Sequence, residues 1–481
     1  MYYQKPSASQ MPLREAIRQL YLADEQQVVQ SLLDSMQENA EQDQRIARSA
    51  GELVENMRAD PRSSNLINNF LQQFTLSSEE GIVLMCLAEA LLRIPDADTA
   101  DALIRDKISS GDWSSHLGKS ESLMVNASTW GMLLTGKWVT MEDNTRQNPY
   151  AFLKRMVAKS GEPAIRLAVR QAMKILGHEF VLAESIERAI DKAGEQEEKG
   201  FSYSYDMLGE AARTDPDAQH YTQAYQQAIS ALANSARSEE SARNSGISVK
   251  LSALHPRYEF AKAERVESEL YGRLLELAVQ SRNGGLGFNI DAEEADRLEL
   301  SLSLFEKLAF EPDLQGWDGL GFEVQAYQKR AHAVIDWMQD LASRSGHRFM
   351  VRLVKGAYWD TEIKRAQVEG LEDYPVFTRK EKTDLCYLVC AQKLLAQPGA
   401  FYPQFATHNA HTVAAVIATV EDLEEMDKQS FEFQCLHGMG EALYQEIVSR
   451  HHYRCRIYAP VGEHKHLLAY LVRRLLENGA N

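Results

Sequence analysis

The sequence predicts an α/β protein, a (β/α)8 TIM-like barrel preceded by an all-helical N-terminal region. Three observations carry this prediction. The chain has 481 residues, which is too long for one ordinary hydrophobic core. Up to about residue 200, apolar residues recur at helical spacing. From Phe201 onward, short β-prone runs alternate with longer helical stretches, which is typical of βα units.

The first 200 residues predict helices. The helical pattern is visible in Pro12–Gln37, where Leu13, Ile17, Leu20 and Tyr21 share one face, and in Gly81–Leu92, Pro163–Leu176 and the charged segment Glu184–Gly200. We divide the chain into an N-terminal helical arm (1–45), a helical domain (46–155), a helical linker (156–200) and the barrel (201–481).

The barrel region contains eight strand candidates, each followed by a helical stretch. They are Ser202–Leu208, Gly246–Leu251, Gly285–Ile290, Gly321–Tyr327, Phe349–Val354, Gln404–Ala406, Ser430–Leu436 and Arg454–Ala459. Eight such units over about 260 residues fit a parallel (β/α)8 barrel. A doubly wound open sheet is the alternative.

Composition narrows the class of protein. With 52 basic and 69 acidic residues the net charge is −17, the opposite sign from a generic nucleic-acid binder. The odd count of five cysteines favours reduced thiols in a cytoplasm, and we expect Cys386 and Cys390, four residues apart, to be buried on one helical face. The sequence shows neither a secretory signal nor an apolar run long enough to span a membrane.

Common nucleotide and metal motifs fail in this sequence. Gly438-Met-Gly440 lacks the third glycine of a dinucleotide-binding loop, and the segment 116–120 lacks the first glycine of a P-loop. His408 and His411 have a zinc-like spacing without a Cys or carboxylate cluster, so we predict no metal site.

Polar groups collect where the predicted strands end, which is where barrel enzymes carry their chemistry. In strand order they are Asp206 and Glu210, Lys250 and Ser252, Asp291 and Glu293, Glu323 and Gln325, Arg352 and Lys355, Thr407 and His408, His437, and Tyr458. Lys250 and Arg352 lie inside apolar runs, and a buried cation needs a partner. Asp291 and Glu210 are the candidates, and the whole set predicts an anionic ligand in the barrel mouth.

The stretch after the last strand carries two adjacent arginines, Arg473 and Arg474. With Tyr470 and Glu477 they follow i, i+3, i+4, i+7 spacing and share one helical face. Guanidinium groups suit a planar carboxylate or a phosphate, so this helix is a candidate for anion binding.

Several motifs in order resemble one family. The segments ISVKLSALHPRYE, FNIDAEEADRLE, GFEVQAYQKRA, VRLVKGAYWDTEIKRAQ, FATHNAHT, FEFQCLHGMGE and YAPVGEHKHLLAYLVRRLLENGAN resemble the proline dehydrogenase domain of the bacterial proline utilization A flavoproteins. The resemblance extends upstream through DWSSHLGKSESLMVNASTWGMLLTGK.

The resemblance implies an FAD-containing barrel that oxidises L-proline to Δ1-pyrroline-5-carboxylate and passes electrons to a membrane quinone. It makes Asp291 and Arg352 the catalytic pair beside the flavin's reactive nitrogen. The implied substrate residues are Lys250, Arg473 and Arg474 on the carboxylate, with Tyr358, Leu436 and Tyr458 around the ring. Glu210 would pair with Arg473 as a gate. The implied cofactor residues are Asp291, Ala292, Gln325, Arg352, Val354, Lys355, Gly356, Ala357, Trp359, Thr378, Lys380, Thr407, His408, Asn409, Leu436 and Glu477.

Larger family members add a C-terminal aldehyde dehydrogenase domain, and some add an N-terminal ribbon-helix-helix domain. We expect neither here, and therefore no nucleic-acid contact; the expected location is the cytoplasm, with peripheral contact to the inner membrane left open. Two alternatives remain. One is a Schiff-base aldolase-type barrel that uses Lys250 or Lys355 as its amine, and the other is a non-catalytic scaffold.

Overall fold

The structure is a computed structural model that describes residues 11–36, 39–59, 99, 180–423 and 427–462. The chain divides into two compact units, residues 1–59 with 182–462 and residues 60–181 with 463–481. Nearly all described residues belong to the first unit.

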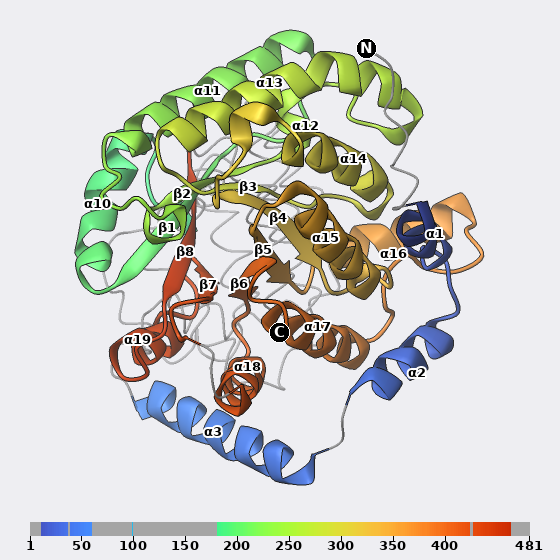
Figure 1. The fold of residues 1–481 in the computed structure, drawn as a ribbon, viewed down its shortest axis with the longest axis vertical. Coiled ribbons are helices and arrows are strands. Elements are labelled where there is room, and N and C mark those ends of the chain that lie inside the picture. The colour runs from blue at the N-terminus through green and yellow to red at the C-terminus, as the bar shows by residue number, and fades with distance from the viewer. Residues whose placement is uncertain (1–10, 37–38, 60–98, 100–179, 424–426, 463–481) are drawn as a thin grey trace, which may run out of the picture. The chain divides into compact units, whose positions relative to one another are not determined.

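Eight parallel strands close into a barrel in the order β1 to β8, and β8 pairs with β1 (Figure 1). The closed order confirms the predicted (β/α)8 class and excludes the doubly wound sheet, whose first and last strands would not meet. The strands are β1 (Phe201–Met207), β2 (Gly246–Val249), β3 (Phe288–Ile290), β4 (Leu320–Gln325), β5 (Phe349–Val354), β6 (Phe401–Ala406), β7 (Glu432–Leu436) and β8 (Cys455–Val461).

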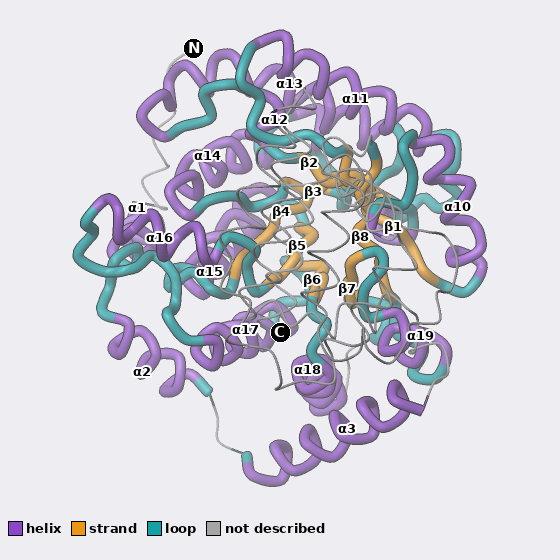
Figure 2. Tube along the Cα trace, turned by 180° about the vertical axis from the view of Figure 1, so that it is seen from behind, coloured by secondary structure: helices purple, strands orange, loops and turns teal. Residues whose placement is uncertain are grey.

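Helices surround the strands, which lie at the centre of Figure 2. They are α10 (Ile186–Glu198), α11 (Asp215–Ala233), α12 (Leu251–Leu254), α13 (Ala263–Asn283), α14 (Leu298–Ala309), α15 (Ala331–Ser345), α16 (Trp359–Glu369), α17 (Lys380–Leu395), α18 (Ala410–Asp422) and α19 (Glu441–Ser449), with short 3-10 turns at Ser241–Arg243, Phe260–Lys262, Ala295–Arg297 and Pro312–Leu314. The apolar core lies between helices and strands, where Trp337 of α15 and Phe405 of β6 are fully buried. Cys386 and Cys390 are buried on α17 with their Sγ atoms 3.9 Å apart, which confirms the expected burial.

Among the described residues, three further helices precede residue 60: α1 (Met11–Gln19), α2 (Glu25–Ser35) and α3 (Ala40–Ala59). The helical pattern over Pro12–Gln37 corresponds to two helices, α1 and α2, rather than to a continuous one. Asp24 accepts a hydrogen bond from the Gln27 backbone N–H at 2.9 Å and caps a new helix, so the chain breaks between α1 and α2. Both α1 and α3 dock on the barrel helices, through Arg14 to Glu299 of α14 and Arg45 to Asp422 of α18.

The other early segments, Gly81–Leu92 and Pro163–Leu176, lie outside the described residues, while α10 occupies most of the predicted charged helix before the barrel. The division of the chain into arm, domain, linker and barrel stays a prediction, although α3 runs continuously past its first boundary at residue 45.

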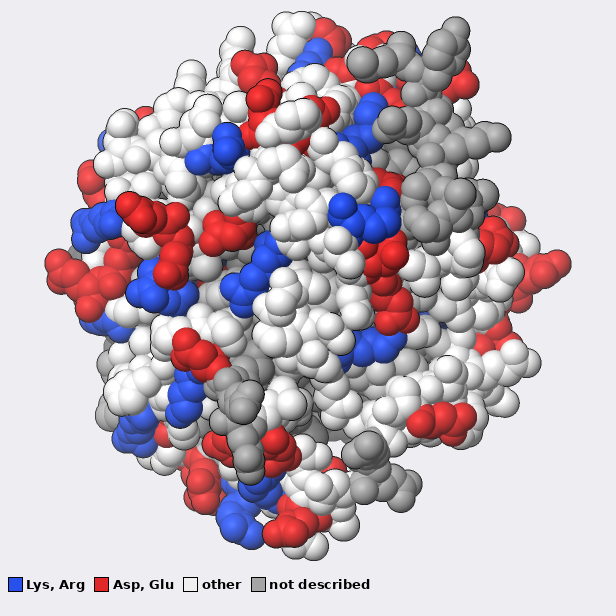
Figure 3. Space-filling model, in the orientation of Figure 1, with Lys and Arg blue, Asp and Glu red and all other residues white. Residues whose placement is uncertain are grey.

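The face of the molecule in Figure 3 carries basic and acidic side chains interspersed. Among the helices described, none has the length and apolar composition needed to cross a membrane.

Candidate active site

The barrel interior is polar, whereas barrel interiors usually hold branched apolar side chains. Since strand residues alternate in direction, every second residue points to the axis. The inward polar residues that contact one another are Ser204, Ser248, Asn289, Asp291, Arg352, Gln404, Glu432, Gln434 and Arg456. Their outward neighbours, such as Val249 and Leu353, are fully buried against the helices.

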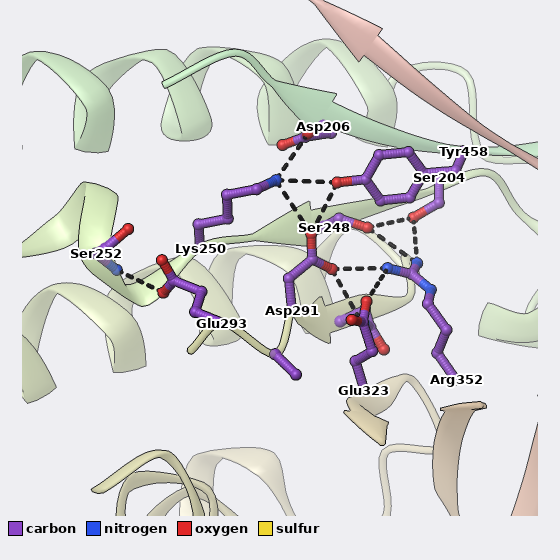
Figure 4. Close-up of polar contacts among 12 residues, drawn as sticks. Ser204, Asp206, Ser248, Lys250, Ser252, Asp291, Glu293, Glu323, Arg352 and Tyr458 are labelled. Carbon is purple, nitrogen blue, oxygen red and sulfur yellow. Dashed lines mark hydrogen bonds and ion pairs between the residues drawn. The ribbon is translucent and has the colours of Figure 1, made fainter. Parts of the chain in front are cut away.

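Five buried residues at the carboxyl-terminal side of the barrel form a group that we call the mouth cluster: Asp206, Lys250, Asp291, Arg352 and Tyr458 (Figure 4). The Lys250 Nζ lies 2.8 Å from Asp206 Oδ2 and 3.2 Å from Asp291 Oδ2, and it donates to the Tyr458 hydroxyl at 2.9 Å. The Tyr458 hydroxyl in turn donates to Asp291 Oδ2 at 2.8 Å. All five side chains are buried.

Arg352 is the other cation of the mouth cluster, and all of its nitrogen atoms are engaged. Its Nη1 donates to Asp291 Oδ1 at 2.7 Å and its Nε to Gln434 at 2.8 Å. Its Nη2 donates to the hydroxyls of Ser204 and Ser248 at 3.0 and 2.9 Å. The guanidinium is therefore held in one orientation by partners from three other strands, β1, β2 and β7, and by Asp291 just after β3.

Electrostatics in the mouth cluster favour the charged form of Lys250 and Asp291. Burial alone would lower the pKa of Lys250, but Asp206, Tyr458 and Asp291 raise it well above its ordinary value. Burial raises the pKa of Asp291, yet Lys250 and Arg352 together outweigh burial and lower it. Burial raises the pKa of Asp206, and the Lys250 ammonium only partly offsets that increase. A Schiff-base lysine needs a neutral amine, so this environment argues against Lys250 in that role.

Of the two carboxylates predicted to pair with the buried cations, one is confirmed. Asp291 does bridge Lys250 and Arg352. The second carboxylate is Asp206 rather than Glu210, which is half-buried in the loop after β1. The signal for Asp206 was present, because it is the last inward-facing residue of β1 and Lys250 follows the neighbouring β2.

The residues after β4 and β5 form one side of the mouth. Gln325, the last residue of β4, is buried, accepts from Gln328 at 2.6 Å and donates to the Ala292 carbonyl at 3.4 Å. Gly356 has φ +135, and a Cβ there would come within 2.5 Å of the Tyr327 ring, so only glycine fits. Val354, Lys355, Ala357 and Tyr358 beside it are half-buried, and Trp359 begins α16 with 41% exposure.

Two predicted cofactor cations share a carboxylate. Lys355 Nζ lies 2.6 Å from Asp384 of α17, and Lys380 Nζ lies 3.5 Å from its other oxygen. Thr378 lies in the loop just before α17 and is half-buried.

The residues after β6 and β7 form the other side. Thr407 is buried, and its carbonyl accepts from the Tyr444 hydroxyl. His408 Nε2 accepts from the Leu436 backbone N–H at 3.1 Å, which joins the ends of the two strands. The side chain of Asn409 caps α18 by accepting from the Thr412 N–H at 2.9 Å.

Arg473, Arg474 and Glu477 lie outside the described residues, as does the predicted Arg473 side of the Glu210 gate. In the described part of the chain, no group of three or more His, Cys, Asp or Glu side chains is arranged to hold a metal ion.

Comparisons with known proteins point to one family. Residues 189–481 match the family model "Proline dehydrogenase", and residues 11–58 match "Proline utilization A proline dehydrogenase N-terminal domain". Residues 66–180 match "DNA-binding domain of Proline dehydrogenase". This last match counts against the expectation of no nucleic-acid contact, and it covers almost only residues outside the described part.

Among curated relatives, the bifunctional protein PutA of Klebsiella aerogenes is 55% identical over 97% of this chain and 36% of its own length. PutA of Rhizobium meliloti is 51% identical over 99% of this chain and 38% of its own. The chain thus spans about a third of the length of these relatives. A crystal structure of a proline utilization A mutant from Bradyrhizobium japonicum matches with TM-score 0.71 and 47% identity, over 96% of this chain and 45% of that one. The Bdellovibrio bacteriovorus enzyme inactivated by N-propargylglycine matches with TM-score 0.72 and 26% identity, over 92% and 42%.

Proposed function

Because the chain belongs to the proline dehydrogenase family, we propose that its barrel oxidises L-proline to Δ1-pyrroline-5-carboxylate, with FAD as cofactor and a membrane quinone as the final electron acceptor. The observation that carries the proposal is the mouth cluster, which buries two cations at the carboxyl ends of the strands, where barrel enzymes bind substrate. The electron acceptor implies peripheral contact of a cytoplasmic protein with the membrane surface.

The residues around the mouth fit a flavin dinucleotide. Such a cofactor needs apolar walls for its rings, an amide for its pyrimidine edge, and cations and hydroxyls for its phosphates. Gln325 supplies the amide, Lys355 a cation and Thr407 a hydroxyl, from three adjacent strand ends. The close approach of Gly356 to the Tyr327 ring keeps that rim free of a side chain. Bound there, the flavin would accept a hydride from the substrate.

The chain's own residues would bind and orient proline. The Lys250 ammonium attracts the carboxylate, and we assign Arg473 and Arg474 as its partners in that contact. Tyr358, Leu436 and Tyr458 are assigned to wall the ring, and Glu210 to close over it by pairing with Arg473. Arg352, fixed by Asp291 and Gln434, presents a positive charge that needs no reorganisation when negative charge develops nearby.

Anaerobic titration with L-proline tests the proposal. We expect the purified protein to be yellow and to lose its flavin absorption as L-proline is added, with D-proline as the control that leaves the spectrum unchanged. A colourless protein whose activity ignores added FAD contradicts the flavin assignment. Borohydride trapping of a lysine adduct, without a flavin spectrum, would instead favour the aldolase-type alternative.

The carboxylate contact is tested by Arg473→Met and Arg474→Met. We expect each substitution to raise the KM for proline by about tenfold or more, because a charge-assisted contact to the substrate is lost. The flavin content should stay close to that of the wild type. A normal KM in either variant would show that the carboxylate binds elsewhere.

A further inference from the structure

The short segment between α1 and α2 contacts the barrel at the loop that precedes α17. Glu25, the first residue of α2, uses both carboxylate oxygens there. One accepts from the Thr378 backbone N–H at 2.8 Å and the other from the Thr378 hydroxyl at 2.8 Å. Lys382 Nζ lies 3.1 Å from the same carboxylate, so the charge of Glu25 is compensated. A charged, bidentate contact of this kind holds Thr378 in one position.

The loop that carries Thr378 lies across the ends of β4 and β5. Val376 forms an antiparallel bridge with Gln328, and the Phe377 N–H donates to the Tyr327 carbonyl at 2.8 Å. Trp359, the first residue of α16, donates its indole N–H to the Phe377 carbonyl at 2.8 Å. Glu25 therefore fixes the outer end of a loop that is already tied to the rim of the mouth.

A second path leads from the same segment to Gln325. The Arg330 guanidinium lies 4.6 Å from the centre of the Tyr21 ring. The Nη2 of Arg330 donates to Gln328 Oε1 at 2.7 Å, and Gln328 donates to Gln325 Oε1 at 2.6 Å. The fully buried Lys329 donates to the Ala23 carbonyl at 2.7 Å and anchors the segment's backbone.

We propose that Tyr21–Glu25 is a supporting part of the cofactor site, in which Glu25 positions Thr378 and Tyr21 positions Gln325 through Arg330 and Gln328. The inference rests on the proposed function, which assigns both end residues to FAD. A site whose donors are held in place loses little entropy when ligand binds, whereas a loosened site must be ordered by the ligand at the expense of affinity.

The test measures FAD affinity of the apoprotein by flavin fluorescence, independently of proline turnover. Glu25→Gln removes the carboxylate charge, so the ion pair with Lys382 is lost and the hydrogen bonds with Thr378 are no longer charge-assisted. We expect the Kd for FAD to rise by about tenfold, which corresponds to about 1.4 kcal/mol. The matched control is Arg45→Gln, which removes a contact of α3 to Asp422 elsewhere on the barrel, and its Kd should equal that of the wild type.

A double variant separates positioning from general stabilisation. If Glu25 acts through Thr378, Glu25→Gln should raise the Kd clearly less in a Thr378→Val background than in the wild type. Equal effects in both backgrounds overturn the proposal, as does an unchanged Kd in Glu25→Gln.

If Glu25→Gln does not fold, as judged by circular dichroism, Tyr21→Leu tests the second path. We expect the Kd for FAD to rise about threefold in that variant, and an unchanged Kd overturns the proposal. Failure of the wild type to bind FAD would overturn the proposed function and this inference together.

Discussion

Two buried charged groups share the barrel axis and differ in how they are satisfied. The mouth cluster lies at the carboxyl ends of the strands. The second group, which we call the base cluster, consists of Tyr402, Gln404, Glu432 and Arg456 near the amino ends of β7 and β8. Arg456 Nε donates to Glu432 Oε1 at 2.6 Å, and the Nη groups also donate to the carbonyls of Tyr203, Ala242 and Asn244.

The difference lies in the partners of the cations: Arg456 donates to three backbone carbonyls as well as to Glu432, whereas the partners of Arg352 are side chains. Every N–H group of Arg456 has a partner within the chain, so the base cluster leaves that cation nothing to offer a ligand. Each cluster also holds one buried oxygen with no hydrogen-bond partner among the described residues, Asp206 Oδ1 in the mouth cluster and Gln404 Oε1 in the base cluster. Gln434 joins the two clusters, because it accepts from Arg352 and donates to Glu432 at 2.9 Å. The base cluster therefore holds the lower side of the mouth rigid.

The largest effect on stability should come from the base cluster. Glu432→Ala leaves Arg456 buried without its carboxylate, and removing one partner of a buried ion pair costs about 3–5 kcal/mol. The free energy of unfolding in urea measures this loss. A loss below about 1 kcal/mol would mean that the backbone carbonyls alone satisfy the arginine.

Arg352→Met should affect chemistry more than stability. Asp291 keeps Lys250, Tyr458 and Asn289 as partners, so the fold should lose less than in Glu432→Ala. In the proposed site Arg352 lies beside the reacting atoms, so loss of its fixed charge should lower kcat for proline oxidation by about a hundredfold. Steady-state kinetics together with urea unfolding of both variants checks the contrast. Equal losses of stability would remove the distinction between the two clusters.

The smallest effect is a pH dependence that arises at the mouth. Glu293, which accepts from the Ser252 N–H at 3.0 Å and lies 3.2 Å from Arg297, has a pKa raised by burial from 4.5 to about 7. The unfolded chain loses this proton near pH 4.5 but the folded protein keeps it until about pH 7, so stability falls as pH rises between these values.

Glu293→Gln removes that proton and its pH dependence. The free energy of unfolding of the variant, relative to that of the wild type, should rise by about 2–3 kcal/mol from pH 4.5 to pH 8. Urea unfolding of both proteins at the two pH values measures this change. The difference in the free energy of unfolding at pH 4.5 gives the cost of the substitution itself. A difference that is constant with pH contradicts the assignment to Glu293.

Much of the barrel was predictable, because its strands are buried apolar runs punctuated by turns. Phe349–Val354 was predicted with the bounds that β5 has. The strand predicted at Gln404–Ala406 was too short, because β6 begins at Phe401. The predicted strand began only after Pro403, since proline is rare inside strands. Lys250 and Arg352 were identifiable as cations inside apolar runs, and Asp291 as a carboxylate that could neutralise them.

Contacts between residues that are far apart in the chain leave no local signal in the sequence. Glu25 and Thr378 are 353 residues apart, and neither has a neighbour in sequence that points to the other. The break between α1 and α2 was missed because the apolar spacing continues through it, while Asp24 decides the outcome by capping. Asp206 was seen at a strand end, but only barrel register places it beside Lys250.

The seam between β1 and β8 has a consequence for how the protein folds. These strands pair over seven residues, yet they lie about 250 residues apart in the chain. At about 5–20 residues per second, a ribosome finishes β8 on the order of 10–50 s after β1. During that interval β1 has an open edge on the side that β8 will cover, and the barrel cannot close. Closure is thus a late, non-local event, and a nascent chain is exposed to wrong strand pairing until its last strand emerges.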